Sequence, residues 1–173
     1  MKKSNIFLAL IALLVFTVTA CEKEDPEGPV GDPAFENYYY AGFLPWNNTG
    51  TESVFRTQTT LVQFPVQFHS AYVRDYDAKA KFTLVSTGIV NPAVVGQDFN
   101  IVDASGNTIT PDNGVYTINF PQAKAQNGAI YVKLLNSSVA GTRRIELNII
   151  KNETAQYTVG NFSQAFKRFL EVK

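Results

Sequence analysis

The sequence predicts an all-β protein whose folded part is a single antiparallel β-sandwich of about seven to nine strands. Short segments alternate apolar and polar residues with a period of two, and clusters of Gly, Asn and Pro separate them. No stretch keeps the 3.6-residue apolar period of a long helix. The composition, with 13 Phe, 8 Tyr and only 17% charged residues, also favours strands.

Residues 1–20 have the pattern of a secretory signal peptide that is removed from the mature chain. Lys2 and Lys3 form a positive start, an apolar run follows at 6–18, and small residues precede position 21. The run is shorter than the ~20 apolar residues that span a bilayer. We therefore expect export rather than a transmembrane helix.

Cys21, the only cysteine of the chain, directly follows the signal peptide. Val18-Thr19-Ala20-Cys21 resembles the lipobox of bacterial lipoproteins. The resemblance implies that Cys21 becomes the first residue and carries acyl chains such as palmitate, which anchor the protein to a membrane. Several acyl chains on one residue anchor stably, whereas a single chain anchors only marginally. A free thiol or an intermolecular disulfide is the alternative for Cys21.

Residues 21–34 comprise this cysteine and an acidic tether rich in Pro and Gly, which we expect to stay solvated. Lys23-Glu24-Asp25 resembles the export signal of Bacteroidota surface lipoproteins, a Lys followed by two acids. The resemblance implies that the protein lies on the outer membrane and faces the exterior. An ordinary acidic linker is the alternative for these three residues.

Residues 35–173 are predicted to form one domain, long enough to bury a core without disulfides. Once Lys2 and Lys3 are removed, 13 basic residues remain against 15 acidic ones, a net charge near −2. This balance argues against nucleic acid as a partner, because phosphate-driven binding needs a basic surface.

The first strand is expected at 36–43, with a loop at 44–50. Alternation places Tyr38 and Tyr40 on one face of this strand. The opposite face holds Phe35, Asn37, Tyr39, Ala41 and Phe43, of which Tyr39 and Phe43 are candidates for the core.

The clearest strand spans 60–68, where apolar residues occupy every second position from Val62 to Phe68. Pro65 lies within it and has no N–H to donate to a ladder. We therefore expect this strand at a sheet edge or with a bulge.

Six further strands are expected, each with an apolar face. They span 79–86, 99–101, 115–120, 129–135, 143–150 and 164–172. Their inward residues are Ala80, Phe82, Leu84, Phe99, Ile101, Tyr116, Ile118, Phe120, Ile130, Val132, Leu134, Ile145, Leu147, Ile149, Phe166, Leu170 and Val172. Turns are expected at 103–107 and 111–114, and Asn127-Gly128 is the strongest tight-turn signal. Residues 121–127 have room for one helical turn at most.

The region from about 60 to 172 resembles the Calx-beta-like, immunoglobulin-like β-sandwich repeats. Val95–Phe99 is similar to that family's Gly-x-Asp-Tyr/Phe element, and 109–120 matches its next strand. Arg143–Ile150 followed by 155–160 resembles its closing pair. The same outline occurs in lipoproteins encoded beside glycan-uptake systems in Bacteroidota.

Calcium-binding members of that family cluster several carboxylates at one end of the sandwich, because calcium takes six to eight oxygen ligands. The candidates here are Asp75, Asp77, Asp98, Asp103 and Asp112. They lie mostly in turns, where Asp commonly bonds the backbone. We therefore predict no metal site and no cofactor.

The sequence contains no motif of an enzyme. It lacks a nucleophile elbow, a paired-histidine zinc motif and a phosphate-binding glycine loop. His69, the only histidine, lies on the polar face of its strand, where a solvated side chain is expected. Two glycosidase carboxylates remain an alternative, since their separation is a three-dimensional property. We expect a protein that is not an enzyme.

Aromatic residues are the best candidates for a ligand site. Tyr38, Tyr40 and Trp46 are predicted to form a platform for sugar rings, and the amides of Asn47 and Asn48 to bond sugar hydroxyls. In the alternative, the two tyrosines cover a neighbouring strand and Trp46 plugs the end of the sandwich.

The expected function is that of a non-catalytic, lipid-anchored envelope protein that binds glycan or protein ligands at the cell surface. The alternative is a structural or adhesive module that holds a partner protein of the envelope. An exposed aromatic patch with convergent amides favours the first function, and a long, unprotected edge strand favours the second.

Overall fold

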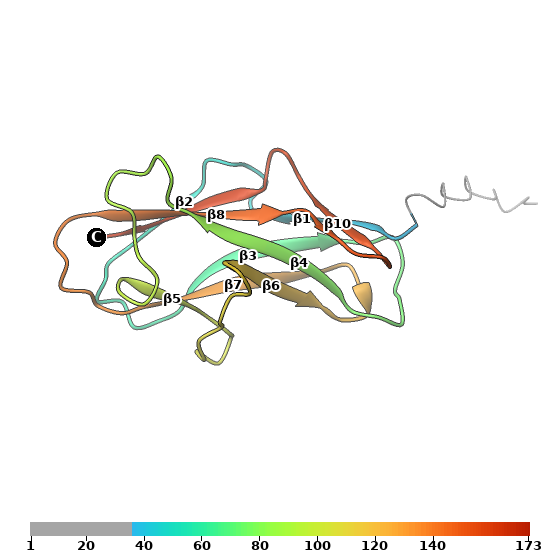
Figure 1. Ribbon diagram of the computed structural model, residues 1–173, viewed down its shortest axis with the longest axis horizontal. Coiled ribbons are helices and arrows are strands. Elements are labelled where there is room, and N and C mark those ends of the chain that lie inside the picture. The colour runs from blue at the N-terminus through green and yellow to red at the C-terminus, as the bar shows by residue number, and fades with distance from the viewer. Residues whose placement is uncertain (1–35) are drawn as a thin grey trace, which may run out of the picture. The chain divides into compact units, whose positions relative to one another are not determined.

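The computed structural model describes residues 36–173, which form a two-sheet β-sandwich (Figure 1). The strands are β1 (Tyr38–Phe43), β2 (Thr51–Val54), β3 (Val62–His69), β4 (Ala78–Val85), β5 (Phe99–Val102), β6 (Val115–Phe120), β7 (Gln126–Leu134), β8 (Arg143–Ile150), β9 (Asn152–Glu153), β10 (Thr158–Asn161) and β11 (Lys167–Val172). A single 3₁₀ turn, η2 (Pro121–Ala123), is the helical element of this part of the chain. None of the described segments is a helix able to cross a membrane.

The first sheet has the strand order β5-β7-β3-β1-β10-β9, and the second has the order β2-β11-β8-β4-β6. The predicted all-β sandwich is thus confirmed. Both sheets are mixed, because β1 pairs with β10 and β2 pairs with β11 in parallel. Turn signals in the sequence indicate only hairpins, whose strands are antiparallel. The two parallel pairs instead join strands from opposite ends of the chain, and the sequence does not indicate whether such strands pair in parallel or antiparallel.

The interior confirms the predicted alternation. The inward residues of β3 and β8 are all at most 5% exposed, and Phe68 stacks on Phe120 with ring centroids 4.4 Å apart. Full burial of one such aromatic side chain stabilises the fold by about 1.5–3 kcal/mol. The core is therefore built mainly from the alternating faces. Leu84 and Ile118, also expected to point inward, are only half-buried, and Ala93, Ala123 and Tyr157 join the core from outside these strands.

The prediction that the Pro65 strand lies at an edge or carries a bulge is wrong. β3 lies between β7 and β1, and its register with β7 is continuous from Val62 to Phe68. The ladder with β1 ends at Val66, opposite Phe43. The carbonyl of Pro65 accepts a hydrogen bond from the N–H of Leu44 (2.9 Å), so its nitrogen also faces the side where β1 has ended. The missing N–H therefore interrupts no ladder.

The predicted tight turn at Asn127-Gly128 is also wrong. Both residues lie inside β7 and pair with Gln67 and Val66. A Cβ at Gly128 would lie 3.1 Å from Cε1 of Phe120, so this glycine allows a close approach of two packed elements. The chain reverses earlier, through η2, which stays within the limit of one helical turn set for residues 121–127.

Three features of the fold were not expected from the sequence. The short strands β2 and β9 lack a clear alternation. The face of β11 that holds Leu170 and Val172 also buries Arg168, which is 3% exposed, while Phe166 is only half-buried.

The signal peptide, the acylated Cys21, the tether 21–34 and the Lys23-Glu24-Asp25 signal lie outside the described residues. Those predictions stay predictions.

Candidate functional site

Aromatic side chains gather on the outer face of the first sheet. We call Tyr38, Tyr40, Phe162 and Trp46 the aromatic surface. Adjacent ring centroids are 5.0 Å apart for Tyr38 and Tyr40, 5.1 Å for Tyr40 and Phe162, and 4.3 Å for Phe162 and Trp46. The structure thus brings together the three aromatic residues predicted to form a platform. Phe162 joins them, and the sequence did not single it out because it follows the end of β10.

Two buried glycines allow these rings to lie against the sheet. A Cβ at Gly42 would lie 2.7 Å from Cδ2 of Phe162. A Cβ at Gly160 would lie 3.0 Å from the hydroxyl of Tyr38 and 3.3 Å from Cε1 of Tyr40. The tyrosines therefore cover the neighbouring strand, as the alternative expected. Tyr40 nevertheless remains 38% exposed.

Trp46 lies on this face rather than in the core, and it is also 38% exposed. Its indole N–H donates to Oε1 of Gln67 (2.9 Å), which lies on the outer face of β3. The ring packs edge-on against His69, with centroids 5.1 Å apart. His69 is thus part of the packing beneath the aromatic surface, and its partly buried ring does not match the solvated side chain expected from the sequence.

The amides of Asn47 and Asn48 are engaged within the protein. Oδ1 of Asn47 accepts from the backbone N–H groups of Thr49 (3.1 Å) and Gly50 (3.0 Å). Asn48 donates to the carbonyl of Ser163 (2.7 Å) and accepts from the N–H of Lys167 (3.1 Å). These amides shape the loop instead of converging on the aromatic surface.

Arg168 holds the same loop from the second sheet. Its guanidinium donates to the carbonyls of Pro45 and Asn47, and to that of Lys167 (2.9 Å). Burial lowers the pKa of the guanidinium, and the charge of Glu52 acts in the opposite direction. The sequence offered one signal for this contact, a charged residue at an inward position of a strand.

None of the four residues of the aromatic surface has an ionic side chain, and among the described residues Lys151 is the cation that the structure places beside it. Lys151 approaches its Tyr38 end, where it pairs with Glu153 at 2.6 Å. The hydrogen bond and the charge of Glu153 raise the pKa of Lys151. A ligand of this surface thus meets rings and hydroxyls rather than an unpaired cation.

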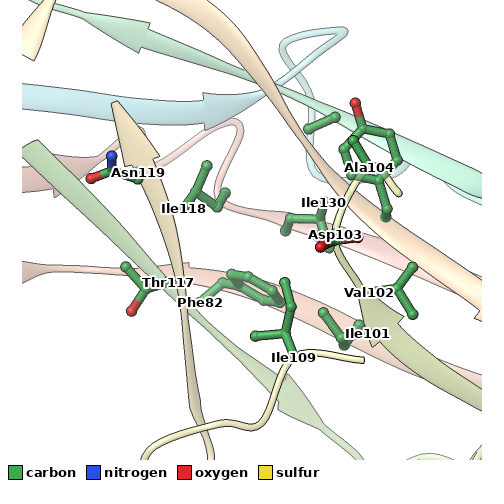
Figure 2. Close-up of a pocket in the computed structure, with 12 residues that line it drawn as sticks. Phe82, Ile101, Val102, Asp103, Ala104, Ile109, Thr117, Ile118, Asn119 and Ile130 are labelled. Carbon is green, nitrogen blue, oxygen red and sulfur yellow. The ribbon is translucent and has the colours of Figure 1, made fainter. Parts of the chain in front are cut away.

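A second concave site opens between the two sheets beside β6. It is a cleft of about 330 Å³ lined by β6, β7, the end of β5 and the turn after it. Figure 2 shows Phe82, Ile109, Ile118 and Ile130 pointing toward one another from different elements.

The edge of β6 beside this cleft is unprotected. β6 contains no charged residue and pairs with β4 alone among the described strands. Val115 exchanges backbone hydrogen bonds with Asp112 on the side away from β4, both 2.9 Å long. Thr117 and Asn119 therefore present their backbone groups on that same side.

The five aspartates considered for calcium do not meet. Asp98 is buried, pairs with Nε of Arg143 (3.0 Å) and accepts from the N–H of Val94 (2.8 Å). Asp103 bonds backbone N–H groups in its own turn, and these bonds with Asn107 lower its pKa. Among the described residues, no three acidic, histidine or cysteine side chains form a group able to hold a metal ion.

No protein-family model and no curated protein matches this sequence. Among solved structures, the chain is similar to the apo form of the Calx CBD1 domain, with 11% identity, a TM-score of 0.48, and coverage of 78% of this chain and 95% of that one. It is also similar to a chain of a type I cohesin–dockerin complex from Clostridium thermocellum (10%, TM-score 0.36, coverage 79% and 100%). A third similar structure is BslA, a bacterial hydrophobin (14%, TM-score 0.29, coverage 78% and 89%). At these TM-scores, none of the similarities indicates what this chain binds.

Proposed function

We propose that this protein is a non-catalytic, lipid-anchored envelope protein that binds neutral glycan chains at the cell surface. The aromatic surface is the observation that carries the proposal. Three tyrosine or tryptophan side chains and one phenylalanine form a continuous row on the outside of the first sheet, with neighbouring centroids 4.3–5.1 Å apart. Sugar rings stack their C–H faces on such rings.

The uncharged side chains of the row support a neutral ligand. An anionic glycan gains little here, because the nearby Lys151 already pairs with Glu153. Tyr38 and Tyr40 supply hydroxyl groups beside their rings, which matches the general pattern of a mostly apolar site with few polar groups. In this proposal, acylated Cys21 anchors the protein to the membrane, and Lys23-Glu24-Asp25 directs it to the cell surface.

The test is binding of residues 22–173 to a panel of neutral and anionic polysaccharides, with Trp46→Ala beside the wild type. We expect binding to at least one neutral polymer, and a loss of at least about tenfold, ~1.4 kcal/mol, in the variant. Because Trp46 is partly exposed, its truncation should cost less stability than the ~3–5 kcal/mol of a buried tryptophan.

Phe55→Ala is the matched control, because Phe55 is 71% exposed and lies outside the aromatic surface. It should bind as the wild type does. Binding that resists Trp46→Ala, or binding of anionic polymers alone, would contradict the proposal.

The uncharged edge of β6 favours the alternative, a module that holds a partner protein. An extended segment of such a partner would add to the backbone of Thr117 and Asn119 and place an apolar side chain in the cleft of Figure 2. Thr117→Pro removes one N–H from this edge and leaves the aromatic surface intact. Loss of binding to envelope proteins in Thr117→Pro, but not in Trp46→Ala, would select this function.

A further inference from the structure

Arg168 is a charged residue buried in the interior, and its burial needs a structural explanation. It occupies an inward position of β11 and is 3% exposed. Burying a guanidinium is costly unless its donors are satisfied. A hydrophobic residue fits the pattern of this strand, whose next inward residues are Leu170 and Val172. The contacts of the guanidinium therefore indicate what it does.

Those contacts converge on the loop that carries Trp46. Arg168 donates to the carbonyls of Pro45 and Asn47, the two residues that flank Trp46 in the chain. A third bond goes to the carbonyl of Lys167 (2.9 Å). The guanidinium lies over the ring of Phe43, 5.5 Å from its centroid.

The loop is built to admit this side chain. A Cβ at Gly50 would lie 2.8 Å from both Cδ and Nε of Arg168, so only glycine leaves the stem its present path. The carbonyl of Gly50 also accepts from the N–H of Phe169 (3.0 Å), which ties the loop to β11 by its backbone. Gly50 thus links the Trp46 loop to β11 in two ways, by leaving room for the Arg168 side chain and by its backbone bond to Phe169.

We propose that Arg168 is the positioning residue of the aromatic surface. Its guanidinium fixes the backbone on both sides of Trp46 and so holds the indole against Phe162 and His69. As a statement about ligand binding, this rests on the proposed function. As a statement about Trp46, it is testable without any ligand. Arginine presents five N–H donors in a rigid planar fork that spans separated carbonyls, whereas the three donors of lysine lie on one nitrogen and reproduce this geometry poorly.

The experiment uses the only tryptophan of the chain as its own reporter. We compare Trp46 emission and its quenching by acrylamide in the full-length chain, purified in detergent, and in Arg168→Lys. We expect the emission maximum of the variant to move to longer wavelength and quenching to increase. Both changes follow from a loop that leaves the packing on Phe162 and becomes solvated.

Arg56→Lys is the matched control. Arg56 also donates to several backbone carbonyls, those of Ser137 (3.0 Å), Gly141 (2.7 Å) and Lys173 (3.1 Å) among them, but it holds a different loop. We expect this variant to lose stability without a change in Trp46 emission or quenching. Arg56→Lys shifting Trp46 as much as Arg168→Lys would reduce Arg168 to a general stabiliser and overturn the proposal.

Gly50→Ala keeps the test decisive if Arg168→Lys fails to fold. The added methyl displaces the arginine side chain, while the positive charge itself is retained. The same shift and increased quenching are expected. Native emission in either folded variant would overturn the proposal. A shift in Trp46 together with no glycan binding by the wild type would instead reject the proposed function and keep the positioning role.

Discussion

At the scale of single residues, hydrogen-bonded side chains join segments that the sequence keeps far apart. Asp77, in the turn before β4, accepts from Nδ2 of Asn119 (2.9 Å) and from the backbone N–H of Gln122 (3.0 Å). The Asn119 bond and then the Gln122 bond hold the pKa of Asp77 below its ordinary value. The sequence offered Asp77 as a calcium candidate, and the structure shows the backbone-bonding role that was its alternative.

The lowered pKa of Asp77 predicts the direction of a pH effect. A group with a depressed folded-state pKa contributes stability that is present above its unfolded pKa, about 4, and is lost as the pH falls through the lower folded value. We therefore expect the wild type to exceed Asp77→Asn in free energy of unfolding at pH 6. The difference should shrink below pH about 4. Urea titrations at both pH values measure it, and a difference that grows on acidification would contradict this role.

At the scale of elements, the alternation of β3 and β8 was predictable from the sequence. The structural role of Gly128 was not. Asn-Gly is a strong turn signal because it tolerates positive φ. Gly128 serves another need, since the ring of Phe120 comes within 3.1 Å of the place where its Cβ would lie. Gly42 and Gly160 play the same part beneath the aromatic surface.

Gly128→Ala tests whether this glycine serves packing. The added methyl would meet Phe120 at 3.1 Å, and overpacking of this kind costs about 1–3 kcal/mol. We expect a loss of that order in the free energy of unfolding, measured by urea denaturation. Ala129→Gly, at the next position of the same strand, is the control for β propensity alone. An unchanged or higher stability in Gly128→Ala would show that the ring of Phe120 shifts without cost, and would contradict a packing role for this glycine.

At the scale of the whole molecule, the membrane attachment that we propose depends on residues before the sandwich. We expect Cys21→Ala to release the protein from the membrane fraction or to leave it unprocessed, because no other residue of the chain can carry a thioether-linked lipid. Metabolic labelling with palmitate should mark the wild type alone. Alanines in place of Lys23-Glu24-Asp25 are the companion variant, which keeps the label and loses surface exposure in protease shaving of intact cells. Equal labelling of Cys21→Ala would exclude this cysteine as the acylation site.

The sequence by itself determined the β-sandwich class, the inward faces of its main strands and three of the four aromatic surface residues. Those properties follow from local periodicity and from residue type, which need no knowledge of distant contacts. Tertiary structure alone decided the strand order, the parallel pairs β1–β10 and β2–β11, and the central place of β3. It also brought Phe162 between Tyr40 and Trp46, and Arg168 beneath the Trp46 loop. The two parallel pairs and the contacts of Phe162 and Arg168 join residues more than 100 positions apart. β3 pairs with nearer segments, but those pairs too depend on the closure of the whole sandwich rather than on a local pattern.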